Sequence, residues 1–235
     1  MDIILSIPHS STHIPTELKD RYALSEEHMN HHLDYGVDTI MAPFSYKKIE
    51  GKASRFVVDV NRARDEFTDG QGVIIVKDWD GNTVFKEPLS EEEREALLTE
   101  YYDPFYSELI DALSPDSLLV DCHSMDSKGN LGGGDVGNQR PQICICTGNG
   151  QSCSREIAMC FIEGFSRNGF ETKENDPYSG SRANILRTAY ERGIPAIAVE
   201  FNKSVYMDEQ SLVLDEEAIE RLRRALTEIF SLLDQ

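Results

Sequence analysis

The stretch LLVDCHSMD, at residues 118–126, decides the fold that we expect for this chain. A short apolar run ends there in an acid, a histidine and a hydroxyl group, and polar, glycine-rich sequence follows it. This pattern predicts a buried strand whose carboxyl end carries functional side chains, as in open α/β sheets. His123 could bind a divalent metal, with Asp121 beside it. A strand-end histidine satisfied by hydrogen bonds alone would give the same pattern.

A second stretch of the same design starts the chain. Residues 3–10, IILSIPHS, form an apolar run that ends at His9. The apolar run at 54–60 is predicted to be another strand, and Asn61 and Arg62 follow it directly. Polar groups that follow several strands of one sheet are typical of a shared site.

Several arginines lie around the predicted strand at 54–60. Arg55, Arg62 and Arg64 are candidates for binding a carboxylate or polarising a carbonyl, because the guanidinium fork suits both tasks. For Arg64, an ordinary surface ion pair is the favoured interpretation.

A further predicted strand, at 194–201, carries Glu200 near its end, where a carboxylate costs free energy unless it is paired or functional. Two histidines, such as His9 and His123, and one carboxylate are the ligands of a hydrolytic zinc site that keeps a position open for water. A carboxylate outside the metal shell can take the proton of that water. An arginine can stabilise the oxyanion. Together these groups predict a metal-dependent amidohydrolase.

Composition limits the partners of the chain. Its 235 residues, 40% of them hydrophobic and 28% charged, suit one α/β domain over residues 1–235. The net charge is −19 and no run is rich in Lys or Arg, which argues against nucleic acid and acidic membrane surfaces as partners. A small anionic substrate remains compatible with this charge, because a few arginines can form a positive pocket. The oligomeric state is left open.

The cysteines and the start of the chain suggest a cytoplasmic protein. There are five cysteines, an odd number without zinc-site spacing, and we interpret them as reduced thiols. The start lacks the basic region and cleavage site of a signal peptide. No apolar run approaches the roughly 20 residues of a membrane span.

The rest of the pattern completes an α/β fold. It predicts, in chain order, a helix at 25–42, a hairpin at 72–87, a helix from Ser90 to about Leu113, a glycine-rich, lid-like loop at 127–141, a strand at 142–147, and helices at 152–168 and 214–233. On the first helix, Asp34 and Asp38 would lie one turn apart on the same face. His28, His31 and His32 fall on the same segment, and we interpret them as exposed polar residues.

Seven short motifs occur in an order that resembles the N-formylglutamate amidohydrolase family, which is related in fold to the zinc carboxypeptidases. The motifs are Pro8-His9-Ser10, DYGVD at 34–38, Arg55 through Asn61-Arg62, DCHSM at 121–125, Gly148 to Cys153, PYSG at 177–180, and EFNK at 200–203 with Tyr206-Met207. The resemblance implies a three-layer α/β/α sandwich with a mixed central sheet, of the phosphorylase/hydrolase-like, zinc-carboxypeptidase-like kind.

The resemblance also implies roles for single residues. His9 and His123 would bind one Zn²⁺, Glu200 would be the general base, and Arg62 would polarise the carbonyl or bind substrate. The His-x-x-Glu ligand pair of the carboxypeptidases is absent, because Thr12 stands three residues after His9. The third ligand must therefore come from elsewhere, and we prefer Asp34 to Asp38.

The substrate implied by the resemblance is a small anionic N-acyl amino acid such as N-formyl-L-glutamate. Asn61, Tyr178, Arg182 and Asn202 would shape the pocket for it. Ser181 follows Gly180 where many relatives have a second glycine, so the pocket can differ.

Two alternatives stay open: a peptidase or deacylase for another N-acyl amino acid or short peptide, and a non-catalytic metal- or ligand-binding relative. Glu200 argues against the second alternative, because metal binding does not need a further acid. A cysteine hydrolase that uses Cys122 beside His123 is disfavoured, because neighbouring strand residues point to opposite faces.

Overall fold

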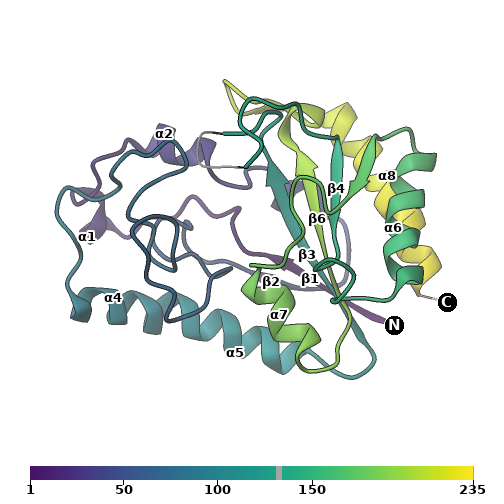
Figure 1. Cartoon of the computed structure of the whole chain (residues 1–235), viewed down its shortest axis with the longest axis horizontal. Helices are drawn as coiled ribbons and strands as arrows, with labels where there is room; N and C mark the ends of the chain where they lie inside the picture. The colour runs from purple at the N-terminus through teal and green to yellow at the C-terminus, as the bar shows by residue number, and fades with distance from the viewer. Residues whose placement is uncertain (131–133, 235) are drawn as a thin grey trace.

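A mixed sheet forms the centre of the fold (Figure 1). The structure is a computed structural model that describes residues 1–130 and 134–234. Within these residues the sheet has six strands in the order β2-β1-β3-β6-β4-β5. Neighbours from β2 to β6 are parallel, β4 runs antiparallel to β6, and β5 is parallel to β4. The strands are β1 (Asp2–Ile7), β2 (Lys47–Glu50), β3 (Ser117–Met125), β4 (Ile143–Cys146), β5 (Thr172–Glu174) and β6 (Ala196–Asn202).

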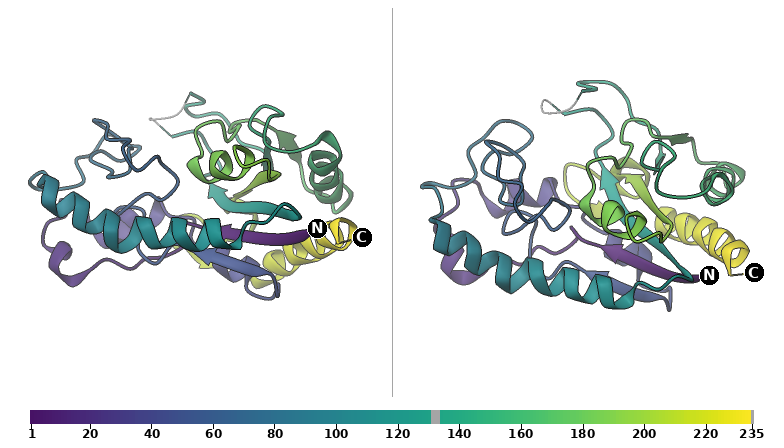
Figure 2. Two further views of the ribbon diagram at one scale, coloured as in Figure 1. Left: turned by 90° about the horizontal axis from the view of Figure 1, so that it is seen from below. Right: turned by 60° about the horizontal axis from the view of Figure 1, so that its bottom comes forward.

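Helices cover both faces of the sheet, which confirms the predicted three-layer α/β/α sandwich with a mixed sheet (Figures 1 and 2). One face packs against α3 (Val37–Met41), α6 (Arg155–Arg167) and α8 (Glu216–Leu233). The other packs against α4 (Glu91–Leu97), the π-helical turn η1 (Leu98–Tyr102), α5 (Asp103–Ala112) and α7 (Asn184–Tyr190). Shorter elements are α1 (Thr16–Lys19), α2 (Glu26–His31), the 3₁₀ turn η2 (Lys203–Val205) and the pair β7 (Met207–Asp208) and β8 (Val213–Leu214).

Strand β3 shows how the sequence pattern directs its side chains. Leu118, Val120 and Cys122 pack in the core below α6 and α8. Because alternate residues of a strand point to opposite faces, Asp121 and His123 share the other face. This alternation places the acid and the histidine side by side.

Two helix predictions are confirmed by their caps and faces. Ser90 caps α4 in a capping box with Glu93, and the helical segment continues through η1 and α5. Helix α8 buries residues such as Ile219, Leu222 and Leu226 at helical spacing. None of the helices within 1–130 and 134–234 is both long and apolar enough to cross a membrane.

The expected single helix at 25–42 is wrong. Helix α2 ends at His31 and α3 begins at Val37, with Gly36 between them at a φ of 83°. A left-handed residue interrupts a helix, and glycine adopts this conformation without steric cost. Asp34 therefore lies in a turn, and it does not share a helix face with Asp38.

The expected strand at 54–60 is also wrong, and the hairpin expected at 72–87 is confirmed only around its turn. Residues 54–60 form buried irregular chain, in which the Asp59 amide donates to the Val73 carbonyl over 2.9 Å. Within 72–87 an isolated antiparallel bridge joins Lys77 to Thr83, and the Val84 amide donates to the Val76 carbonyl over 3.0 Å, while the rest of the segment forms turns and bends. A buried apolar run looks alike in a strand and in a packed loop, which explains the error at 54–60. Of the glycine-rich loop at 127–141, Gly132 and Gly133 lie outside the described residues.

Candidate active site

Two histidines from neighbouring strands and one aspartate meet at the carboxyl ends of β1 and β3. His9 follows β1, His123 lies in β3, and their ring centroids are 5.1 Å apart. The Asp34 amide donates to the His9 carbonyl over 3.1 Å, which brings the turn onto the end of β1. Asp34 Oδ2 lies 3.2 Å from His9 Nδ1 and 3.0 Å from His123 Nδ1. All three side chains are buried.

A second carboxylate holds the far nitrogen of each imidazole. His9 Nε2 lies 2.9 Å from Asp59 Oδ1, and His123 Nε2 lies 2.8 Å from Asp121 Oδ2. Histidines that bind metal usually have such a partner on the other nitrogen, because it fixes the ring and raises the basicity of the ligand. Both rings therefore direct Nδ1 toward Asp34.

Electrostatics favour the charged forms of Asp34 and His123 despite burial. Burial alone would raise the pKa of Asp34, but the hydrogen bonds from His123 and His9 keep it well below its usual range. Burial alone would lower the pKa of His123, but Asp121 and Asp34 raise it well above its usual range. Each histidine in effect faces two carboxylates, and a cation is the natural partner of such a group.

The residues at this point fit a divalent metal. One donor atom from each of His9, Asp34 and His123 lies within 4.8 Å of the other two. Two imidazole nitrogens and one carboxylate oxygen are a ligand set of hydrolytic zinc. Asp38 lies exposed on α3, away from this group.

Glu200 lies on β6 directly beside His123 in the register of β3 and β6. No side chain or backbone group in the described chain forms a hydrogen bond or ion pair with its carboxylate. Burial raises the pKa of Glu200 to about 8, and the neighbouring Asp34 adds to this effect while His123 opposes it. A carboxyl group with a pKa near neutrality can take a proton from water and return it.

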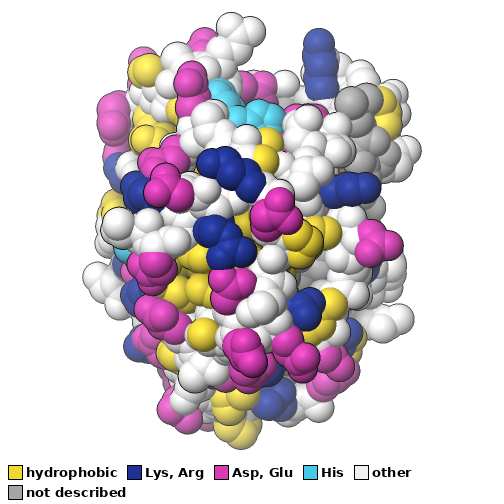
Figure 3. Space-filling view, turned by 90° about the vertical axis from the view of Figure 1, so that its left-hand side faces the viewer, with side chains coloured by type: hydrophobic (Ala, Val, Ile, Leu, Met, Phe, Trp, Pro, Cys, Tyr) yellow, Lys and Arg dark blue, Asp and Glu magenta, His cyan; other side chains and the backbone are white. Residues whose placement is uncertain are grey.

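A cavity of about 400 Å³ opens above these residues. Its walls carry five basic side chains in a chain whose net charge is −19. Figure 3 shows one face of the molecule, on which basic side chains are interspersed with acidic ones and histidines reach the surface. The basic residues of the cavity are Arg55, Arg62, Arg140, Arg182 and Lys203.

Four of these basic groups already pair with an acid. Arg55 pairs with Asp59, Arg140 with Asp135, Arg182 with Glu66 and Lys203 with Asp126. Arg62 instead donates to the backbone carbonyls of Gln71 and Asn61. Within 1–130 and 134–234, Arg62 is therefore the basic side chain of the cavity without a carboxylate partner.

Comparison with known proteins identifies the family. The sequence model of N-formylglutamate amidohydrolases matches residues 1–207. The chain belongs to the N-formylglutamate amidohydrolase family. It is therefore a hydrolase that acts on an amide. No curated protein matches the sequence.

Two solved structures share the fold of this family member. An N-formylglutamate amidohydrolase from Ralstonia eutropha JMP134 has a TM-score of 0.84 and 17% identity, over 99% of this chain and 93% of that one. A gene product from Agrobacterium tumefaciens has a TM-score of 0.77 and 19% identity, over 100% of this chain and 92% of that one.

The residues predicted to bind substrate in this amidohydrolase differ in their placement. Asn61, Tyr178 and Arg182 line the cavity. Asn202 is absent from the described cavity wall: its amide donates to the carbonyls of Arg140 and Pro141 and accepts from the Ser204 amide. Its amide caps η2, which leaves it no group for a substrate. The structure therefore does not support this prediction.

Some residues of the site were not foreseen in these roles. Asp59 holds His9, and Arg55 donates to Asp59 over 2.7 Å. Burial would raise the pKa of Asp59, but Arg55 and His9 keep it well below its usual range. The sequence signal for this role was the presence of an acid, Asp59, inside the apolar run at 54–60. Arg140 and Lys203 also line the cavity, and their signals were the lid-like loop at 127–141 and the EFNK motif at 200–203.

Cys122 does not form part of this chemistry. All five cysteines are free, and Cys122 packs on the sheet face opposite His123. Burial raises the pKa of the Cys122 thiol well above its usual value. This placement agrees with the expectation that Cys122 and His123 cannot act as a nucleophile and base.

Proposed function

We propose that this chain hydrolyses the amide of a small anionic N-acyl amino acid, such as N-formyl-L-glutamate, with the help of one zinc ion. The observation that carries the proposal is the arrangement of His9, Asp34 and His123, each histidine held at Nε2 by a buried carboxylate, with Glu200 beside them. We further propose that residues 1–235 act as one catalytic domain. The free cysteines favour the cytoplasm as its compartment.

His9, Asp34 and His123 would hold the zinc ion. The Nδ1 atoms and Asp34 Oδ2 supply three protein ligands, the number typical of catalytic zinc. When bound, zinc lowers the pKa of its water to about 7 and polarises a carbonyl. Ser124 Oγ donates to Asp34 Oδ1 over 3.1 Å, which leaves Asp34 Oδ2 directed at the histidines.

Glu200 would serve as the base and then as the acid. It accepts a proton from the attacking water, whose oxygen bonds to the acyl carbon. When the C–N bond breaks, Glu200 returns the proton to the leaving amine. The products of N-formyl-L-glutamate would then be formate and glutamate. Its lack of a hydrogen-bond partner among the described residues leaves the Glu200 carboxylate available for both transfers.

Arg62 would bind the developing oxyanion or a substrate carboxylate. It is the cavity's basic side chain that no described acid neutralises, so its charge is available to a ligand. Tyr178 and Asn61 would shape the pocket around the substrate. The charge of Arg62 is the feature that favours an anionic N-acyl amino acid over a neutral peptide.

The test is hydrolysis of N-formyl-L-glutamate by the zinc-loaded protein, with N-formyl-L-glutamine, which lacks only the side-chain charge, as the matched substrate. We expect formate release from both, and a higher kcat/KM for the glutamate. Equal values would reject recognition of the side-chain carboxylate, and turnover of other N-acyl amino acids alone would favour the deacylase alternative. Bound zinc without hydrolysis of any amide would reject the proposed function.

A further inference from the structure

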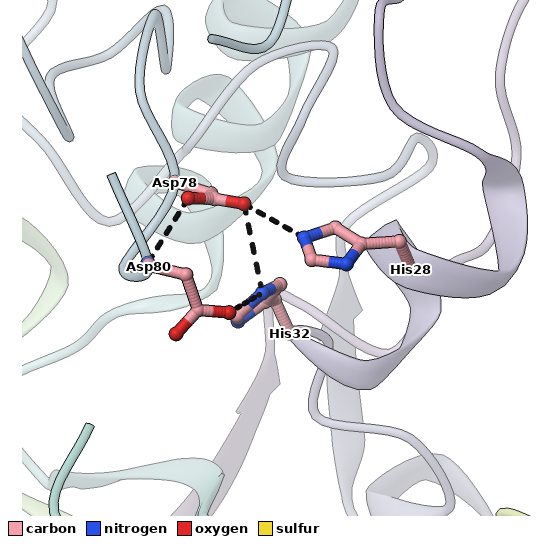
Figure 4. Close-up of side chains that lie close together, drawn as sticks. All are labelled: His28, His32, Asp78 and Asp80. Carbon is pink, nitrogen blue, oxygen red and sulfur yellow. Dashed lines mark hydrogen bonds and ion pairs between the residues drawn. The ribbon is translucent and has the colours of Figure 1, made fainter. Parts of the chain in front are cut away.

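A second group of histidine and aspartate side chains lies apart from the proposed catalytic residues. It contains His28 and His32 at the carboxyl end of α2, and Asp78 and Asp80 from the turn at 78–82 (Figure 4). Donor atoms of the four residues all lie within 4.8 Å of one another. The four side chains point toward a common centre (Figure 4). The function proposed above uses none of them.

The distances in this group are close to those of a tetrahedral metal site. Asp78 Oδ2 lies 2.7 Å from His28 Nε2 and 3.9 Å from His32 Nε2, and Asp80 Oδ2 lies 3.4 Å from His32 Nε2. Zinc bonds of about 2.0–2.2 Å place neighbouring ligand atoms about 3.4 Å apart. Side-chain shifts of about 1 Å would therefore complete the shell around an ion.

The surrounding protein holds these side chains in place. Asp78 is fully buried, and its Oδ1 accepts from the amides of Asp80 and Asn82 over 3.0 and 2.7 Å. The His32 ring stacks on Trp79 with a centroid distance of 5.4 Å. His28 and His32 are four residues apart at the end of α2, so their rings lie on one side. Such support is what keeps metal ligands oriented.

We propose that His28, His32, Asp78 and Asp80 bind a second divalent transition-metal ion, and that zinc fills this site. Four protein ligands complete a tetrahedral shell and leave no position for a reacting water, which is the arrangement of a structural ion. Zinc binds both imidazole nitrogen and carboxylate oxygen, the two donor types of this group. A structural role distinguishes this ion from the one proposed at His9 and His123.

The ion would tie an irregular segment to the helical part of the protein. The segment at 70–86 contains isolated bridges and turns, and Asp78 and Asp80 lie in it. His32 and Trp79 line the substrate cavity, so an ion at His32 would also fix this wall. The Arg55 guanidinium also lies over the Trp79 ring, 4.5 Å from its centroid.

Zinc titration of the His123→Ala variant tests the proposal, because this variant lacks a ligand of the other group. Trp79 is the only tryptophan of the chain, so its fluorescence reports on the ring stacked against His32. We expect a saturable fluorescence change, about one bound zinc per chain and a zinc-dependent rise in the melting temperature. The two further variants are His28→Ala and Asp80→Asn, each combined with His123→Ala. Both altered side chains are partly exposed, so the variants should fold.

The control is His31→Ala in the same background, which removes a histidine of α2 outside the group. We expect the control to keep the zinc, the fluorescence change and the melting shift, and the two further variants to lose them. Zinc binding that survives both further variants, or no binding in His123→Ala itself, would overturn the proposal. Neither result depends on turnover, so both are separate from a failure of the proposed hydrolase activity.

Discussion

The two histidine–aspartate groups of this protein border the same cavity but have different surroundings. The group of His9, Asp34 and His123 is buried, and further carboxylates hold both histidines at Nε2. The group around His28 is half-open: 34% of the His28 side chain is exposed, and 41% of Asp80. The first provides three ligands and a neighbouring free acid, Glu200, whereas the second provides four ligands. Similar ligands thus suit catalysis in one place and structure in the other.

Removing one histidine from each group should give the largest difference between the proposed catalytic site and the proposed structural site. We expect His123→Ala to abolish hydrolysis and to lose about one zinc per chain, because a catalytic ion needs all three protein ligands. His28→Ala should lose about one zinc as well, but it should keep the zinc at His9 and Asp34. Metal content and formate release measure both results. Loss of all zinc in either single variant would mean that the groups are not independent.

Glu200 should distinguish a reactive site from a metal-binding one. We expect Glu200→Gln to lower kcat by about 10²–10⁴ while zinc content stays unchanged, because general-base catalysis contributes this much. The matched control is Asp38→Asn, an exposed acid on α3 that should behave like the wild type. A zinc-loaded Glu200→Gln enzyme with normal kcat would mean that Glu200 is not the general base and does not distinguish the two groups.

The carboxylates that contact Nε2 of the buried histidines should strengthen zinc binding. We expect Asp121→Asn to weaken zinc binding or activity by up to about 100-fold, because the amide supports His123 less than a carboxylate does. Competition with a chelator gives the zinc affinity. An unchanged affinity and rate would show that Asp121 serves only to pack β3.

Arg62 should affect substrate binding rather than zinc binding. We expect Arg62→Ala to raise KM for N-formyl-L-glutamate about tenfold, since one hydrogen bond to a charged group is lost. The matched control is Arg64→Ala, because Arg64 pairs with Glu95 and Asp103 on the surface. If both variants shift KM equally, the role of Arg62 reduces to general surface charge.

The stability of the metal-free protein should depend on pH through Glu200. Burial raises the pKa of Glu200 from 4.5 to about 8, so the folded protein keeps this proton while the unfolded chain releases it. The resulting stabilisation is complete below pH 4.5 and is lost as pH rises to about 8. We expect urea unfolding to show the wild type losing stability relative to Glu200→Gln over this range. If the difference in unfolding free energy between the two proteins does not change with pH, the pKa of Glu200 in the folded protein is an ordinary one.

Much of the sheet was predictable because its strands are buried apolar runs bounded by turns. β1, β3, β4 and β6 lie close to where the sequence predicted them, and His9, His123 and Glu200 all lie at the cavity. The short strands β2 and β5 carry too few apolar residues to be recognised. The segment at 54–60 was mistaken for a strand because burial alone does not define the backbone conformation.

The sequence by itself determined the α/β layering, the family and the histidines at two strand ends, because these depend on local periodicity and motif order. Only the tertiary structure decided that Asp34, and not Asp38, meets the histidines, since Gly36 ends the helical path between them. It also brought Asp59 to His9, and Asp78 and Asp80 to α2. Those contacts join residues 46 to 52 positions apart, and the three acids lie in irregular segments, whose path depends on packing and not on periodicity.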